Sequence, residues 1–168
     1  QPRSRGLGDV YKRQGLLDPL EVVAAVESAY HRGEAPIESV EGFIRQIIGW
    51  RDYVWHLYWE YGEDYLDSNF LNATTPLPEA WKELNGKVIE ARCLSKTIEN
   101  TSTNAWTHHI QRLMVLGNVA LQRGYNPREV NDWLVDAFVD GTPWVMPANA
   151  IGMSLFADGG RMSTKPYA

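Results

Sequence analysis

Apolar residues recur at helical spacing in several separate stretches of this chain, and residues that start or stop helices bound each stretch. Asp18 followed by Pro19 begins the first stretch and Gly33 follows its end, so the pattern predicts a helix over residues 18–32. No stretch keeps the alternation of apolar and polar residues that a half-buried strand requires. The sequence therefore predicts an all-α fold without internal repeats.

Further helices are expected on both sides of one long loop over residues 67–78, which is rich in Asn, Thr and Pro. The residues after Asp140 are rich in Pro, Gly and Asn, and they predict a second loop that contains one short helix. The expected helices are residues 39–61, 79–84, around 88–93, the apolar stripe of residues 110–121 that Gly124 ends, and 126–138.

Composition narrows the class of protein only partly. A chain of 168 residues is long enough for one domain with a real core, and its seven Trp and eight Tyr favour either an aromatic core or a site for a planar ligand. The net charge of −5 is unusual for a protein that mainly grips phosphate backbone, so nucleic-acid binding would need a local basic rim.

Cys93 is the single cysteine, which excludes an internal disulfide and indicates a reducing compartment, for which we take the cytoplasm. By itself one thiol cannot form an iron–sulfur site, and a lone cysteine is most often a buried apolar residue. We expect no membrane span and no secretory leader, because no apolar run approaches about 20 residues. We also expect a monomer without an obligate protein partner.

The two ends of the chain are interpreted separately from the rest. Residues 1–14 (QPRSRGLGDVYKRQ) have no clear apolar period and resemble translated adaptor sequence, so we interpret them as a non-native segment. Residues 165–168 follow a Gly-rich turn directly. We expect residues 15–168 to be an internal part of a longer protein.

The segment Thr107–Arg112 (THHIQR) carries the strongest chemical signal. On a helix, His108 and Arg112 would lie one turn apart, and His109 would share a face with Arg112. An imidazole can transfer a proton near neutral pH, and a guanidinium can bind phosphate or the edge of a flavin. Helical histidines of this kind are more often surface or supporting residues, so the pattern alone does not identify a site.

Two further groups of residues could serve a planar ligand. The helix around Trp50 and Arg51 is rich in aromatic residues and carries positive charge, which suits either an unstacked base or an aromatic core. The loop from Asp140 to Asn149 could present carboxylate and amide groups to a cofactor, or it could be a simple connector.

Taken together, four segments resemble a known family. EGFIRQIIGWRDYVWHLYW (41–59), NAWTHHIQRLMVLGN (104–118), NAIGMSLFADGG (149–160) and KPYA (165–168) are similar, in this order, to the deoxyribodipyrimidine photolyase-related proteins. These are the iron–sulfur bacterial cryptochromes and (6-4) photolyases. The resemblance implies that residues 15–168 are part of a FAD-binding helical domain. The parent protein would be a DNA photolyase, a carbon–carbon lyase that binds UV-damaged DNA.

The resemblance also implies roles for single residues. In such a protein, light-excited reduced FAD donates an electron to a flipped-out pyrimidine (6-4) photoproduct. The roles are His109 as the lesion-facing proton donor with His108 beside it, Arg112, Asp140 and Asn149 near the flavin, Trp133 as an electron relay, Trp50 and Arg51 at the lesion or DNA, and Cys93 as one of four ligands of a 4Fe–4S cluster.

The chain also departs from the family pattern. It lacks the other three cluster cysteines, the antenna domain and the serine-rich phosphate-binding segment, so we expect it to hold neither cluster nor antenna chromophore and to bind FAD weakly or not at all. Two other interpretations stay open. They are a cryptochrome-like photoreceptor that signals through the same flavin pocket, and a non-catalytic helical domain whose aromatic residues are core.

Overall fold

A computed structural model describes residues 17–164 of the chain. Over this range the protein is helical, and its only β-type pairing is a single bridge between Thr75 and Tyr125, so the predicted all-α class is confirmed. The chain divides into two compact units, residues 1–60 and 61–168. The interpretations of residues 1–14 and 165–168 fall outside the described residues. Within these residues, no helix has the length and hydropathy needed to cross a bilayer.

The first unit begins with helix α2 (Pro19–His31), which agrees with the predicted helix over 18–32. Asp18 caps it, because its carboxylate accepts the Leu20 N–H at 2.7 Å. Gly33 has φ 73°, a left-handed conformation that glycine adopts without strain, and it ends the helix as expected.

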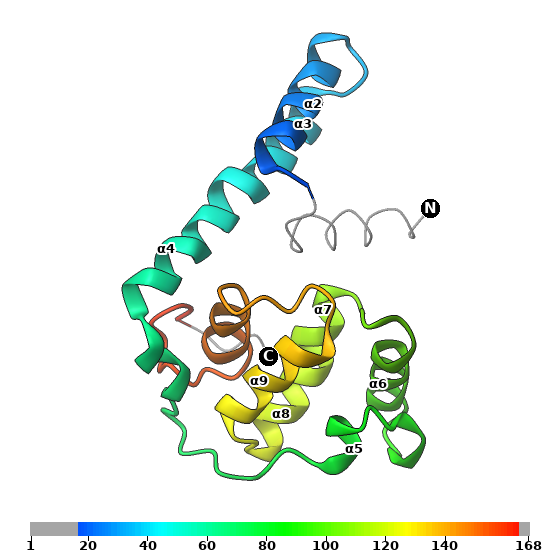
Figure 1. The fold of residues 1–168 in the computed structure, drawn as a ribbon, viewed down its shortest axis with the longest axis vertical. Coiled ribbons are helices and arrows are strands. Elements are labelled where there is room, and N and C mark those ends of the chain that lie inside the picture. The colour runs from blue at the N-terminus through cyan, green and yellow to red at the C-terminus, as the bar shows by residue number, and fades with distance from the viewer. Residues whose placement is uncertain (1–16, 165–168) are drawn as a thin grey trace. The chain divides into compact units, whose positions relative to one another are not determined.

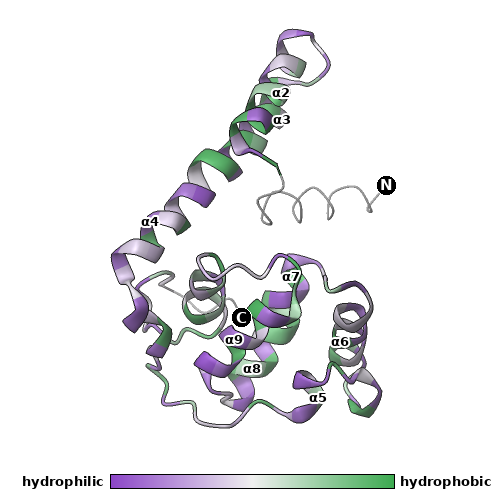
Figure 2. Ribbon diagram, in the orientation of Figure 1, coloured by the Kyte–Doolittle hydropathy of each residue, from purple (hydrophilic) through white to green (hydrophobic). Residues whose placement is uncertain are grey.

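The long helix predicted over 39–61 is present as three consecutive pieces. These are α3 (Ile37–Arg45), a π-helical turn η1 (Gln46–Arg51) and α4 (Asp52–Tyr61), whose ribbon alternates between polar and apolar stretches in Figure 2. The helix starts two residues earlier than predicted, because Pro36 precedes the first turn with extended backbone. Val40, Ile47 and Val54 are its buried residues.

The second unit packs short helices around one hydrophobic core (Figure 1). Trp81, Ile98, Leu116, Val130 and Ile151 are among its most deeply buried side chains. The elements are η2 (Glu63–Asp67), α5 (Glu79–Lys82), η3 (Gly86–Val88), α6 (Arg92–Asn104), α7 (His109–Gln111), η4 (Arg112–Gly117), α8 (Asn118–Arg123), α9 (Pro127–Ala137) and η5 (Ala148–Ser154).

The helix predicted around residues 88–93 was wrongly placed. The helix there is α6, which starts at Arg92, and only a 3-10 turn precedes it. Its buried face contains Thr97 and Thr101, whose hydroxyls donate to the carbonyls of Cys93 and Thr97, both at 2.9 Å. Because these hydroxyls are satisfied by the helix itself, threonine can be buried where the sequence pattern requires an apolar residue.

Elements η4 and η5 lie against each other at a very close approach. A side-chain carbon added at Gly117 of η4 would lie 2.6 Å from the Cβ of Ser154 in η5, so only glycine fits there. The short helix expected in the loop after Asp140 is η5, and it is therefore packed on the core. This contact brings together two segments that carry predicted site residues.

Candidate functional site

His108 does not lie within a helix but caps one. Its Nδ1 accepts the Ile110 N–H at 3.1 Å, and its own backbone N–H donates to the Gln111 Oε1 at 3.3 Å, which together form a reciprocal capping box. The His108 side chain is exposed, whereas that of Arg112 is buried. The prediction that these two side chains share one helical face is therefore wrong, because His108 occupies the position before the first helical residue.

Arg112 forms the central interaction of the candidate site. Its guanidinium donates to the Asp140 carboxylate at 2.6 Å and to the Thr107 carbonyl at 3.0 Å, and it lies 4.1 Å from the centre of the Phe138 ring. The side chains of Arg112 and Asp140 are only 4% and 2% exposed. A buried ion pair of this kind is costly to desolvate, so its presence indicates a role in fixing geometry.

The backbone around these residues departs from α geometry at three places. The π-helical turns η1, η4 and η5 contain Trp50 and Arg51, Arg112, and Asn149 respectively. π-Turns are rare, and they occur frequently at functional sites because the inserted residue re-aims the side chains beside it. Every π-turn of the described residues therefore contains at least one residue that the sequence had singled out.

His109 is the first residue of α7 and is half-buried, so its imidazole remains within reach of solvent. Thr107 is buried just before it, and its hydroxyl bonds to the Gln111 side chain while its carbonyl holds Arg112. Sequence reasoning missed Thr107 and Gln111. No signal in the sequence pointed to this cap, since His108 is not one of the usual capping residue types and Thr107 lies four positions before Gln111, not three.

Asn149 is 5% exposed, and its two side-chain atoms differ in their hydrogen bonding. The Nδ2 donates to the Val145 carbonyl at 2.8 Å, which fixes the orientation of the amide. The Oδ1 is buried and accepts no hydrogen bond from the described residues, and the same holds for the Asn118 Oδ1, the Asn131 Oδ1 and the Thr142 Oγ1. Buried acceptors without donors are unfavourable unless a bound group supplies an N–H or O–H.

Trp133 lies in the core within a chain of aromatic contacts. Its indole N–H donates to the Trp81 carbonyl at 2.8 Å, and the two ring systems lie 5.1 Å apart. Trp81 contacts Tyr125 at 5.7 Å, while Trp133 contacts Phe138 at 5.8 Å. Since Arg112 lies over Phe138, the chain of rings runs from the buried ion pair towards Tyr125. Sequence reasoning singled out only Trp133 of these rings.

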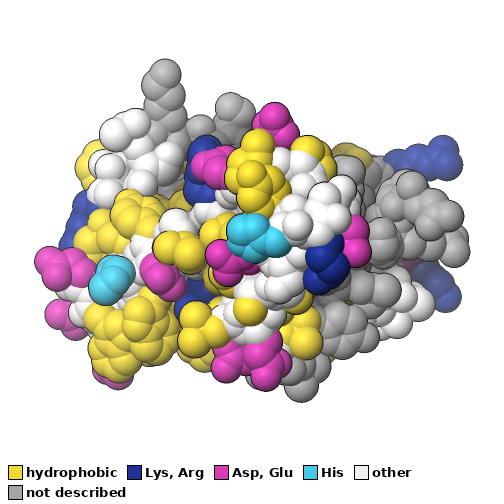
Figure 3. Space-filling model, turned by 90° about the horizontal axis from the view of Figure 1, so that it is seen from above, with side chains coloured by type: hydrophobic (Ala, Val, Ile, Leu, Met, Phe, Trp, Pro, Cys, Tyr) yellow, Lys and Arg dark blue, Asp and Glu magenta, His cyan; other side chains and the backbone are white. Residues whose placement is uncertain are grey.

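Trp50 and Arg51 belong to the first unit. The Trp50 ring is half-buried and lies 6.0 Å from that of Tyr53, while Arg51 pairs with Asp52 at 3.3 Å. The face in Figure 3 mixes hydrophobic side chains with scattered acidic and basic ones.

Cys93 is exposed, which overturns the expectation that a lone cysteine is a buried apolar residue. Its position at the start of α6 leaves the thiol on the outer side, while Leu94 points into the core. Between residues 17 and 164, no group of three or more His, Cys, Asp or Glu side chains could hold a metal ion. Cys93 can therefore offer one thiolate, and no larger ligand set lies around it in this part of the chain.

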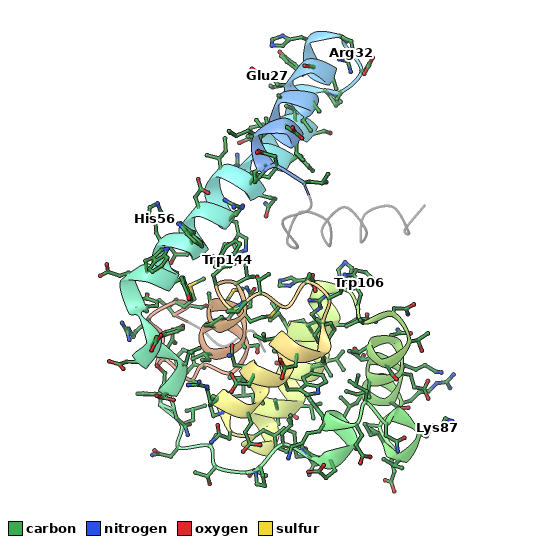
Figure 4. All side chains as sticks on the ribbon, viewed as in Figure 1. Glu27, Arg32, His56, Lys87, Trp106 and Trp144 are labelled. Carbon is green, nitrogen blue, oxygen red and sulfur yellow. The ribbon has the colours of Figure 1, made fainter. Side chains whose placement is uncertain are left out.

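Two cavities formed by described residues lie away from the Arg112–Asp140 pair. One of about 420 Å³ is lined by Trp133, Glu129, Asp132 and Asp136 among others, and one of about 360 Å³ lies between the 69–75 segment and the end of α8. Trp106 lies at the connection from α6 to α7, and Trp144 lies between α9 and η5 (Figure 4). Of the predicted site residues, Trp133 lines the first cavity, whereas Arg112, Asp140 and Asn149 line neither.

Comparison with known proteins gives one extensive similarity. No model of a protein family matches the chain. Over 158 residues, or 94% of its length, it is 51% identical to a (6-4) photolyase of Agrobacterium fabrum, and it spans 31% of that protein's length. Over 42 residues it is 45% identical to an uncharacterized protein of Acanthamoeba polyphaga mimivirus, covering 25% of this chain and 34% of that protein. The first similarity extends across both units.

Proposed function

Because the chain belongs to the photolyase family, we propose that it forms part of the FAD-binding helical domain of a light-driven (6-4) photoproduct-repair enzyme. The observation that supports this most directly is the buried Arg112–Asp140 pair beside the capped turn of His109. Arg112 and Asp140 lie 28 residues apart in the sequence, and the family resemblance assigns both of them to the flavin. The chain spans about a third of the length of the (6-4) photolyase that it resembles, so the proposed activity is that of a longer parent protein.

The described residues fit a flavin on one specific point. The buried Asn149 Oδ1 is an acceptor without a donor among the described residues, and a flavin ring carries an N–H group that could satisfy such an acceptor. We therefore assign Asn149, Arg112 and Asp140 to flavin binding. When bound and reduced, FAD would supply the light-driven electron that the repair reaction needs. The Arg112 cation, held by Asp140, would contribute a fixed positive charge next to it.

His109 is assigned to proton transfer at the lesion. It is half-buried, its helix is fixed by a capping box, and Arg112 anchors the same helix to Asp140. A positioned imidazole can give or take a proton near neutral pH, and such a group contributes about 10²–10⁴-fold to a rate. His108 points to the Ile110 amide, so we assign it to supporting this turn and not to the proton transfer itself.

Trp133 is assigned to electron supply. Its ring lies in a continuous aromatic chain with Trp81 and Tyr125, and its indole N–H is fixed by a hydrogen bond. Closely spaced rings in a rigid core are suited to pass an electron inward because little reorganisation accompanies each step. Tyr125 is only half-buried, so the chain of rings leads towards solvent.

Two assignments depend on parts of the protein beyond this chain. Trp50 and Arg51 are proposed to contact damaged DNA, with Trp50 as an aromatic surface and Arg51 as a positive charge. Cys93 is proposed as one ligand of a 4Fe–4S cluster. The described residues do not fit a cluster by themselves, because they supply a single cysteine, and no step of the proposed reaction is routed through it.

The test is repair of a (6-4) oligonucleotide under blue light by the full-length parent protein. His109→Ala should abolish repair while FAD absorbance is retained, because the change removes the proton donor and leaves the Arg112–Asp140 pair intact. His56→Ala is the matched control, since His56 is an exposed histidine of α4. Normal repair by His109→Ala would refute its role. A wild-type parent that photoreduces FAD but repairs nothing would favour a photoreceptor instead.

The relay is tested separately by the rate of flavin photoreduction. Trp133→Phe should slow photoreduction strongly and leave binding of the lesion unchanged, because phenylalanine keeps the packing but is a far poorer electron donor than tryptophan. Phe138 in the same chain of rings provides the comparison, since Phe138→Leu should change photoreduction much less. Equal rates for wild type and Trp133→Phe would exclude Trp133 from the relay.

A further inference from the structure

The cap at His108 depends on the protonation state of its imidazole. Nδ1 of His108 accepts the Ile110 N–H, so this nitrogen must carry a lone pair and the ring must be neutral. A protonated imidazole has two N–H donors and no acceptor, and it also places positive charge where the amides at a helix start are themselves positive. Protonation therefore removes the hydrogen bond and replaces it with repulsion.

We propose that His108 is a positioning residue whose neutral imidazole caps the turn that carries His109 and Arg112, and that this turn loosens when His108 takes up a proton. The inference rests on the proposed function only where it concerns the roles of His109 in proton transfer and of Arg112 in flavin binding. The cap itself is a property of this chain, and it can be measured without flavin or DNA.

The structure gives a short path from the cap to the buried ion pair. The other half of the capping box is Gln111, whose Oε1 accepts from the His108 backbone and from the Thr107 hydroxyl. The Thr107 carbonyl accepts from the Arg112 Nε at 3.0 Å, and Arg112 reaches Asp140. Loss of the cap therefore loosens Gln111 and, through it, Thr107, whose carbonyl holds one side of the guanidinium, while Asp140 continues to hold the other.

Ionisable groups lie on the elements packed against this turn, and α6 among them carries Arg92, Cys93, Lys96 and Glu99, of which Lys96 and Glu99 pair at 2.8 Å. His109 and Arg112 lie in the turn itself, and Asp140, on the segment that follows α9, is joined to it by the hydrogen bond from Arg112; next to Asp140, the Val139 N–H donates to the Ala105 carbonyl at the end of α6 at 2.8 Å. Arg112 and Asp140 balance each other's charge.

The test is amide hydrogen exchange and ¹⁵N NMR of the 168-residue chain, from about pH 8 to about pH 5, the range in which imidazoles titrate. The protection factor of the Ile110 amide should fall by about fivefold as His108 becomes protonated, as expected for loss of a helix cap. The ¹⁵N shift of His108 Nδ1 reports its protonation directly. The Arg112 Nε–H signal reports whether the loosening reaches the guanidinium.

Two substitutions separate the titrating cap from a merely structural one. His108→Asn supplies a capping side chain that does not titrate, so protection at Ile110 should stay high and lose its pH dependence. His108→Ala should lower protection at every pH, and His56→Asn should keep the wild-type profile. Constant protection in the wild type while His108 titrates, or a persistent pH dependence in His108→Asn, would overturn the proposal. Neither result bears on repair by the parent, so the two proposals can fail independently.

Discussion

Asp140→Asn tests whether the buried ion pair organises the second unit. The substitution keeps the shape of the side chain and one carbonyl oxygen, but it leaves the Arg112 guanidinium, only 4% exposed, without its counter-charge. Removing one partner of a buried pair typically costs 3–5 kcal/mol, and the remaining amide oxygen puts this case at the lower end, about 3 kcal/mol. The free energy of unfolding, measured by urea denaturation and circular dichroism at pH 7, should fall by that amount.

An exposed pair of the same chemical kind provides the control. Arg128 and Asp132 pair at 3.1 Å on α9 with side chains 46% and 52% exposed, so Asp132→Asn should cost no more than about 0.5 kcal/mol. Replacing Arg112 by Met in the Asp140→Asn background should recover part of the loss, because no unpaired charge is then buried. A cost below about 1 kcal/mol for Asp140→Asn, or equal costs at the two sites, would refute the reasoning.

Two further changes test the packing of the second unit and its pH dependence. Gly141→Ala should destabilise the chain by more than about 2 kcal/mol in urea denaturation, because the added carbon would lie 2.2 Å from the Val135 carbonyl oxygen, whereas Gly42→Ala, with open space in α3, should stabilise it by about 0.5–1 kcal/mol. Burial, followed by the hydrogen bond to Asp158, raises the pKa of Tyr65. The stability advantage of wild type over Tyr65→Phe should therefore be full below about pH 10, the unfolded value, and shrink as pH rises above it; an advantage that grows instead would contradict the assignment.

The sequence pattern predicted most of the helices because their ends carry strong local signals. Asp18 with Pro19, Gly33 and Asn126 with Pro127 all act where they were expected to act. The position of α6 was predicted wrongly for a physical reason. Its buried face contains threonines, whose hydroxyls bond to carbonyls of the same helix, and threonine does not contribute to a pattern of apolar residues. The spacing of apolar residues in a sequence cannot reveal a polar side chain that is buried because it forms a hydrogen bond with the backbone.

The candidate site was predictable in its residues but not in its geometry. Arg112 and Asp140 were both singled out, yet no pattern in the sequence indicated that they form a buried pair across 28 residues. His108 was expected on the helix because residues 108–112 fit helical spacing, and only the coordinates distinguish a capping residue from a helical one. Trp81 was missed because a single aromatic residue in a short helix looks like any core residue.

The π-turns explain why helical spacing alone could not assemble this site. A turn with one extra residue rotates every following side chain relative to an ideal helix, so residues aligned by a 3.6-residue period before the turn are no longer aligned after it. Arg112 begins η4 and Asn149 lies in η5, and these two turns are pressed together where Gly117 meets Ser154. The site therefore depends on two irregular segments, η4 and η5, whose backbones can approach each other only because Gly117 has no side chain. The buried Arg112–Asp140 pair fixes η4 to the segment after α9.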